Sequence, residues 1–305
     1  MGLLDGRVVL VTGGGRGLGK AHCLEIAGHG ATVVVNDVGA GLGGEGGDDS
    51  PADEVAQLIR DVGGTALVDH TSVSDFNGVA ALIERIVDEC GALDAVVNNA
   101  GILRDRMITA MSEEEFDAVI DVHLKGTWNV TRHACAYWRE QTKAGTPRAA
   151  RIVNTTSGAG LFGNVGQTNY APAKAAIATL TICTAMEMAR NGVTANAISP
   201  IARTRMTAGI GSFDEEATGD FDPLDPATTS PVAAWLCSVE SGWMSGQVLR
   251  VDGDTVLRVE PWSIADPIWY RGKKNEPVDA TALGMGLRVA YGAFPGGIPS
   301  SPIKD

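Results

Sequence analysis

Short apolar segments alternate along the chain with longer segments in which apolar residues recur every three or four positions. The short continuous runs predict buried strands, and the longer recurrence predicts helices with one buried face. The predicted strands span residues 8–12, 31–37, 65–68, 93–98, 151–156, 193–199 and 247–252. The predicted helices span residues 18–28, 51–61, 76–89, 112–142, 169–190 and 231–238. This alternation predicts an α/β fold, a doubly wound parallel sheet with helices on both faces.

The longest predicted helix carries its own start signal. Ser112 and Glu115 have the spacing of a capping box, in which each side chain bonds the other residue's backbone N–H. Polar and apolar residues then recur at three- and four-residue steps, which predicts one buried face. The members of this stripe are Phe116, Ile120, His123, Thr127 and Val130.

Two segments depart from the alternation. Residues 203–230 are irregular and acidic, and we interpret them as a flap over a substrate. Residues 259–305 follow the last predicted strand and are rich in proline, which predicts a C-terminal extension. We therefore expect one domain over residues 1–258, followed by that extension.

Composition narrows the function. With 24 basic and 37 acidic side chains the formal net charge is −13, so nucleic-acid binding is not expected. We find neither a secretory signal nor an apolar run long enough to span a membrane. The five cysteines are widely spaced, which predicts reduced thiols, a cytoplasmic location and no metal site.

A glycine-rich segment links the first strand to the first helix. Thr12 to Gly19 contains five glycines, which allow backbone N–H groups and a helix N-terminus to approach a pyrophosphate. Asp37 ends the second strand, where a carboxylate binds a ribose diol and repels a 2′-phosphate. Arg16 could instead hold that phosphate, but Asp37 faces the discriminating oxygen more directly. The sequence therefore predicts NAD as the cofactor.

A second group of polar residues suggests acid–base chemistry. Tyr170 and Lys174 are one helical turn apart, so that an ammonium could lower the pKa of a phenol. Ser157, just after the fifth strand, could donate a hydrogen bond to a substrate oxygen. Each residue alone is more commonly structural, but the three together with the glycine-rich segment predict a catalytic site.

These motifs resemble those of the classical short-chain dehydrogenase/reductase family, whose members have a Rossmann-type fold. The resemblance rests on Thr12 to Gly19, Asn98-Asn99-Ala100-Gly101, Ser157 and the pair Tyr170 and Lys174, in the family's order. Further segments resemble the (3R)-hydroxyacyl-CoA dehydrogenase part of peroxisomal multifunctional β-oxidation enzymes and its bacterial stand-alone relatives. These segments are Val35 to Asp37, Asn99 to Arg106, Val122 to Gly126, Gly163 to Gln167 and Arg205 to Thr207.

The resemblance implies roles for individual residues. Tyr170 would be the general acid/base and a coenzyme contact, Lys174 would lower its pKa and bind the nicotinamide ribose, and Ser157 would orient the substrate oxygen. The coenzyme would also contact residues from several loops. These are Gly13, Arg16, Gly17, Leu18, Gly19, Asp37, Ser72, Val73, Asn99, Pro200, Ala202 and Thr204.

Two positions depart from the family's patterns. His123 stands where most members have an asparagine that holds a water next to the lysine, and the β-oxidation subgroup shares this histidine. It is either a buried structural residue or a member of a catalytic proton relay. Thr71 stands where the subgroup has an aspartate, so the resemblance does not imply adenine recognition by a carboxylate at that point.

The resulting hypothesis is an NAD-dependent enzyme that interconverts a secondary alcohol and a ketone, with a (3R)-hydroxyacyl-CoA as substrate. The alternatives are a 17β-hydroxysteroid dehydrogenase, a 3-ketoacyl reductase and a non-catalytic module that senses NAD(H). Members of the family are commonly oligomeric, so the resemblance implies a homodimer or homotetramer. Trp128 and Trp138 lie on the helix that would form the subunit contact.

Overall fold

A single eight-stranded sheet organises the computed structural model, which describes residues 2–208, 213, 219 and 221–260. The strand order is β3-β2-β1-β4-β5-β6-β7-β8, and all pairs from β3 to β7 are parallel. The strands are β1 (Val8–Thr12), β2 (Thr32–Asn36), β3 (Thr65–Asp69), β4 (Ala95–Asn98), β5 (Arg151–Thr155), β6 (Thr194–Ile201), β7 (Val248–Asp252) and β8 (Thr255–Val259). The predicted Rossmann-type α/β fold is confirmed.

The eighth strand was not predicted from the sequence. β8 pairs antiparallel with β7, and Asp252 lies opposite Thr255 across a two-residue turn. The first turn residue, Gly253, has φ 56°, a conformation that favours glycine. The prediction that residues 247–252 form the last strand was therefore wrong, although this glycine turn between two apolar runs is a hairpin signal.

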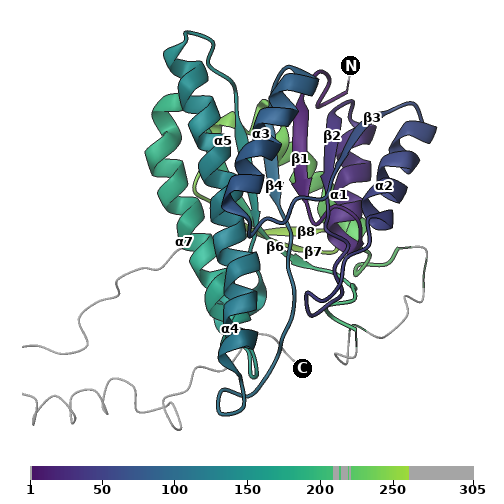
Figure 1. Ribbon diagram of the computed structural model, residues 1–305, viewed down its shortest axis with the longest axis vertical. Helices are drawn as coiled ribbons and strands as arrows, with labels where there is room; N and C mark the ends of the chain where they lie inside the picture. The colour runs from purple at the N-terminus through teal and green to yellow at the C-terminus, as the bar shows by residue number, and fades with distance from the viewer. Residues whose placement is uncertain (1, 209–212, 214–218, 220, 261–305) are drawn as a thin grey trace, which may run out of the picture. The chain divides into compact units, whose positions relative to one another are not determined.

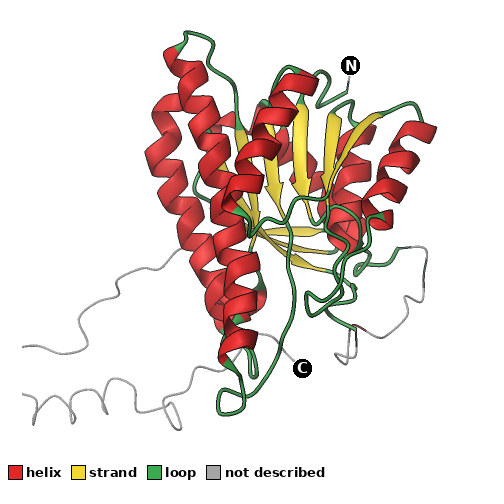
Figure 2. Ribbon diagram, viewed as in Figure 1, coloured by secondary structure: helices red, strands yellow, loops and turns green. Residues whose placement is uncertain are grey.

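Helices cover both faces of the sheet (Figure 2). They are α1 (Gly17–Gly28), α2 (Ser50–Asp61), α3 (Phe76–Cys90), α4 (Glu113–Ile120), α5 (Gly126–Lys143), α6 (Gly158–Phe162), α7 (Tyr170–Met188) and α8 (Ser230–Cys237). Apolar residues of α1, α2 and α8 pack on one face of the sheet, and those of α3, α5 and α7 pack on the other. Figure 1 shows α3, α5 and α7 side by side. None of the helices in the described ranges combines the length and the apolar character needed to cross a bilayer.

The predicted long helix is interrupted by one π-helical turn. Its capping box is confirmed: Ser112 Oγ accepts from Glu115 N at 3.1 Å, and Glu115 Oε2 accepts from Ser112 N at 3.0 Å. The π turn, Asp121–Lys125, joins α4 to α5 and widens the spacing between hydrogen-bonded residues. This shift changes which residues face the core. Phe116 is 40% exposed, so its predicted burial was wrong, whereas His123 is buried as predicted.

A fully buried histidine joins α1 to α8. His22 Nδ1 lies 2.9 Å from Ser230 Oγ, and its Nε2 has no hydrogen-bond partner. Burial lowers the pKa of His22 to about 4. His22 takes up a proton at a higher pH in the unfolded chain than in the folded chain. Its contribution to the free energy of unfolding is therefore complete above the pKa that it has in the unfolded chain. That contribution is lost as the pH falls toward 4.

We expect His22→Asn to flatten the pH dependence of stability. Asparagine can keep the hydrogen bond to Ser230 but does not titrate. Between pH 6 and 4.5 the wild-type free energy of unfolding should fall more steeply, by about 1.4 kcal/mol per pH unit. Urea unfolding of both proteins at several pH values measures this difference. Equal slopes for the two proteins would contradict the assignment of a buried, neutral His22.

Candidate active site

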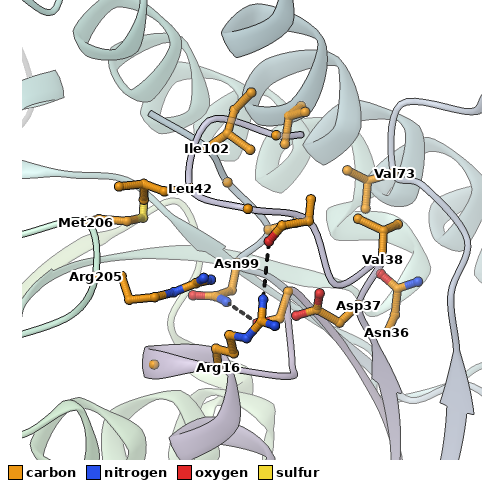
Figure 3. Close-up of a pocket in the computed structure, with 18 of the residues that line it drawn as sticks. Arg16, Asn36, Asp37, Val38, Leu42, Val73, Asn99, Ile102, Arg205 and Met206 are labelled. Carbon is orange, nitrogen blue, oxygen red and sulfur yellow. Dashed lines mark hydrogen bonds between the residues drawn. The ribbon is translucent and has the colours of Figure 1, made fainter. Parts of the chain in front are cut away.

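A cleft opens where β1 and β4 end. These neighbouring strands are followed by connections to opposite faces of the sheet, and α/β proteins bind ligands at such a point. The cleft has a volume of about 320 Å³. In Figure 3, Leu42 and Met206 form one side of the cleft and Val38 and Val73 form the other.

The glycine-rich segment forms the floor of the cleft. Gly13 and Gly17 have φ values of 63° and 50°, which favour glycine, and α1 begins at Gly17. A Cβ at Gly19 would collide with the carbonyl oxygen of Gly13. The backbone therefore turns tightly before a helix N-terminus, whose first N–H groups lack partners within the helix. This cradle fits the pyrophosphate of a dinucleotide.

Asp37 lies at the edge of this cradle. Its Oδ2 accepts from Gly15 N at 2.8 Å, and its Oδ1 accepts from Gly39 N at 2.7 Å. Arg16 is held by the loop after β2, because its Nη1 donates to Ala40 O at 3.2 Å and its Nη2 lies 3.9 Å from Asp48 Oδ2. The carboxylate of Asp37 thus has a fixed position and keeps oxygen lone pairs that can accept from a ribose diol.

Most of the predicted coenzyme contacts lie together in the cleft wall. These are Gly13, Arg16, Gly17, Leu18, Asp37, Ser72, Val73, Asn99 and Thr204. Five other predicted contacts do not line it. Gly19 lies beneath the cradle against Gly13 and Asn99, Pro200 and Ala202 lie at and just after the end of β6, and Tyr170 and Lys174 lie on α7.

Three predicted catalytic residues come together through α6 and α7. Tyr170 is the first residue of α7, and Ser157 caps the N-terminus of α6, where its Oγ accepts from Ala159 N at 3.2 Å. α6 packs closely on α7, because a Cβ at Gly160 would lie 2.6 Å from Lys174 Cβ. Lys174 is buried, and its Nζ donates to Thr155 O at 2.7 Å.

The protonation of this group differs from the prediction. Burial raises the pKa of Tyr170, a hydrogen bond with Ser157 opposes that rise, and the charge of Asp105 adds to it. Burial lowers the pKa of Lys174 to about 7. The sequence predicted that Lys174 lowers the phenol's pKa. Here its Nζ lies 5.7 Å from the centroid of the Tyr170 ring and bonds a carbonyl instead, so burial dominates.

His123 connects the cleft to Tyr170. Its ring is perpendicular to the tyrosine ring, with centroids 5.1 Å apart. Its Nε2 lies 2.7 Å from Ile102 O, and Ile102 lines the cleft. Nδ1 is buried without a hydrogen-bond partner, and burial lowers the pKa of His123 to about 3. The ring is therefore neutral, with one nitrogen holding the loop after β4.

Asp69 holds the loop at Thr71 but does not supply a carboxylate to the cleft in place of the subgroup's aspartate. Thr71 lines the cleft, and its N–H donates to Asp69 Oδ1 at 2.8 Å. Asp69 also accepts from Asn36 Nδ2 at 2.7 Å and forms a 2.6 Å ion pair with Arg85. The carboxylate thus supports the loop from below. Among the described residues that line the cleft, Asp37 carries the one carboxylate.

A loop that sequence reasoning left unassigned forms one rim of the cleft. Residues 40–44, which the sequence analysis did not assign, contribute Ala40, Gly41, Leu42 and Gly44 to the lining. Leu42 O accepts from Leu103 N at 2.9 Å, and Gly43 O accepts from Arg104 Nε at 2.7 Å. Both contacts join segments about sixty residues apart, so no local pattern could have predicted them.

Arg205 was also missed as a binding candidate. It lines the cleft together with Thr204, whose Cγ2 would lie 3.5 Å from a Cβ at Gly17. Figure 3 shows its side chain directed toward Asn99. This cation is therefore placed at the glycine-rich end of the cleft. Its position directly after Thr204, a predicted coenzyme contact, could have indicated Arg205 from the sequence.

The arrangement suits proton transfer next to a bound dinucleotide. It combines an anion-binding cradle, a phenol and a buried lysine amine on one helix, and a serine hydroxyl beside them. Within the part of the chain that the structure describes, no group of three or more histidine, cysteine or acidic side chains could hold a metal ion.

Comparison with known proteins identifies the family. The family model for short chain dehydrogenases matches residues 7–215. The hydroxyacyl-CoA dehydrogenase ChsB1 of Mycobacterium tuberculosis is 43% identical over 282 residues, which cover 92% of this chain and 87% of that protein. The peroxisomal multifunctional enzyme type 2 of Drosophila melanogaster is 43% identical over 277 residues, covering 84% of this chain and 44% of that longer protein.

A solved structure supports the same assignment. The crystal structure of a short chain dehydrogenase from Mycobacterium avium superposes with a TM-score of 0.84 at 48% identity, covering 95% of this chain and 96% of that one. These similarities agree with the fold, the cradle and the polar group described above. The chain therefore belongs to the short-chain dehydrogenases, oxidoreductases that act on CH–OH groups of small molecules with a nicotinamide coenzyme, NAD or NADP.

Proposed function

We propose that the protein oxidises a (3R)-hydroxyacyl-CoA to the 3-ketoacyl-CoA with NAD. The observation that carries this proposal is the 43% identity, over 92% of the chain, to a protein named as a hydroxyacyl-CoA dehydrogenase. The proximity of Tyr170, Ser157 and Lys174 supports the reaction type, because alcohol oxidation needs a base beside the hydroxyl group.

In this proposal each polar residue has a separate role. Tyr170, as phenolate, accepts the proton of the substrate hydroxyl, and Ser157 donates a hydrogen bond to the same oxygen. Lys174 holds the coenzyme's ribose near Tyr170. The bound coenzyme supplies the acceptor for the hydride that leaves the carbinol carbon. His123 holds the loop after β4, and its buried, neutral ring supports the structural alternative over a place in a proton relay.

The preference for NAD rests on the charges around the cleft. Asp37, fixed by two backbone N–H groups, would repel the 2′-phosphate of NADP. Arg16 is occupied by Ala40 O and lies near the Asp48 carboxylate, so it is less available to hold that phosphate. Arg205 lies at the glycine-rich end, where a cation would bind a pyrophosphate instead.

The substrate and the coenzyme can be tested together. We expect purified protein to reduce NAD faster than NADP when (3R)-hydroxyacyl-CoAs are supplied, followed by the absorbance of the reduced nicotinamide. Oxidation should accelerate as the pH rises from neutral, because burial raises the pKa of Tyr170 and the reaction needs its phenolate. The panel should include (3S)-hydroxyacyl-CoAs, 17β-hydroxysteroids and, for the reverse direction, 3-ketoacyl thioesters.

Each contrary outcome identifies a different alternative. Activity with hydroxysteroids and with none of the acyl-CoAs would replace the proposed substrate by a steroid. Efficient reduction of ketoacyl thioesters without alcohol oxidation would make the protein a ketoacyl reductase. Binding of NADH without turnover of any alcohol or ketone would support a sensor of NAD(H).

Assembly and domain boundaries are also proposals. A homodimer or homotetramer is supported by the stacked pair Phe76 and Trp128, which are 37% and 45% exposed. Trp138 cannot contribute to a subunit contact, because it is fully buried and donates to Leu93 O at 2.8 Å.

Five unpaired thiols support a cytoplasmic location. The proposed flap at 203–230 lies partly, and the extension at 259–305 almost wholly, outside the described residues.

A further inference from the structure

The geometry points to Asn169 as a positioning residue for Tyr170, one that fixes the phenol relative to Ser157 and Lys174. This inference rests on the proposed role of Tyr170 as the acid/base. Asn169 directly precedes Tyr170 in the chain and has no exposed surface. Neither the sequence motifs nor the lining of the cleft includes it.

The side-chain amide of Asn169 bonds three separate segments. Its Oδ1 accepts from the backbone N–H of Tyr170 at 2.7 Å. Its Nδ2 donates to Arg104 O at 2.8 Å and to Glu115 O at 3.2 Å, which belong to the loop after β4 and to α4. Both amide hydrogens and the amide oxygen are thus used. The peptide that carries the phenol is fixed against the loop that lines the cleft.

Neighbouring contacts reinforce the same junction. Gln167 Nε2 donates to Asp105 Oδ2 at 2.8 Å, and Arg106 N donates to Gly166 O at 2.8 Å. Gln167 thereby also holds the Asp105 carboxylate, whose charge acts on Tyr170. The hydrogen bond accepted by Asn169 Oδ1 differs from these two, because its donor is the backbone N–H of Tyr170.

A helix cap alone would not require asparagine. Serine and aspartate also accept from N–H groups at a helix start. Neither replaces the two donations of Nδ2, and an aspartate would place a negative charge against two carbonyl oxygens and close to the phenol. An asparagine at this point therefore determines both the position of Tyr170 and the charge around it.

We expect Asn169→Asp and Asn169→Ser to lower kcat by about 100-fold, as misplacement of a reacting group does. The affinity for NADH should change little, because Asn169 does not line the cleft. Asn169→Asp should in addition raise the pKa of Tyr170. That pKa is measured without substrate, by ultraviolet difference titration of each protein against the same protein carrying Tyr170→Phe.

Asn196 provides a matched control. It is 1% exposed, its Nδ2 donates to Met244 O at 2.9 Å and its Oδ1 accepts from Gln247 N at 3.1 Å, away from the catalytic group. Asn196→Asp should lower thermal stability as Asn169→Asp does, yet leave kcat of the folded enzyme and the phenol's pKa unchanged. The inference would be overturned if both substitutions changed kcat equally. It would also be overturned if the pKa of Tyr170 in folded Asn169→Asp equalled that of the wild type.

The titration separates this inference from the proposed function. If Asn169→Asp shifts the phenol's pKa while the wild type oxidises no hydroxyacyl-CoA, the positioning role stands and the substrate assignment fails. If the wild type oxidises the acyl-CoA but folded Asn169→Asp keeps both the wild-type kcat and the wild-type pKa of Tyr170, the substrate assignment stands and the positioning role fails.

Discussion

Replacing Tyr170 by phenylalanine is expected to lower kcat by about 10²–10⁴-fold, the usual contribution of a general acid or base. The substitution removes the phenolic oxygen and leaves a ring of the same shape against His123. Because the substitution removes one oxygen and leaves the cleft lining unchanged, the dissociation constant of NADH should remain near the wild-type value. Steady-state kinetics and NADH fluorescence titration measure the two quantities.

Tyr137 offers the matched control for this substitution. It lies on α5 and packs against the core, so Tyr137→Phe removes a hydroxyl group without touching the catalytic group. That variant should retain wild-type kcat. Turnover by Tyr170→Phe within a few-fold of wild type would remove Tyr170 from the proposed chemistry.

Gly19→Ala is expected to abolish most coenzyme binding. Its added methyl group would collide with the backbone carbonyl of Gly13, so the cradle must shift. Overpacking of this kind costs about 1–3 kcal/mol, and a loss of that size in binding free energy would weaken NADH binding by about 5- to 150-fold. Fluorescence titration of NADH against the folded variant measures the change.

Gly28→Ala is the control for this prediction. Gly28 lies on the same helix, and a Cβ there would meet no atom within 4 Å. This variant should bind NADH as the wild type does. Unchanged affinity in Gly19→Ala would mean that the cradle does not hold the coenzyme, since the substitution cannot leave that backbone in place.

The fold was predictable where the sequence pattern is local and strong. Residues 8–12 form β1 as predicted, and the box of Ser112 and Glu115 starts α4 where its spacing indicates. The π turn at Asp121–Lys125 was not predictable in the same way. Side-chain recurrence every three or four residues does not show where one helical turn contains an additional residue, so the exposure of Phe116 depends on tertiary packing.

The site was predictable where its members belong to short motifs. The glycine-rich segment, Asp37 and the pair Tyr170 and Lys174 could all be found by spacing, and the structure brings the first two into one cleft. Asn169 and the 40–44 loop could not, because their contacts join segments distant in sequence. The protonation of Tyr170 also depends on burial, which spacing does not reveal.

The attachment of residues 40–44 to Leu103 and Arg104 has a thermodynamic consequence. Two carbonyls of this rim, those of Leu42 and Gly43, accept hydrogen bonds from these residues before any ligand arrives. A glycine-rich segment left free would lose much conformational entropy when a ligand ordered it. Here that ordering accompanies folding, so the rim is preorganised and more of the contact energy remains available for affinity.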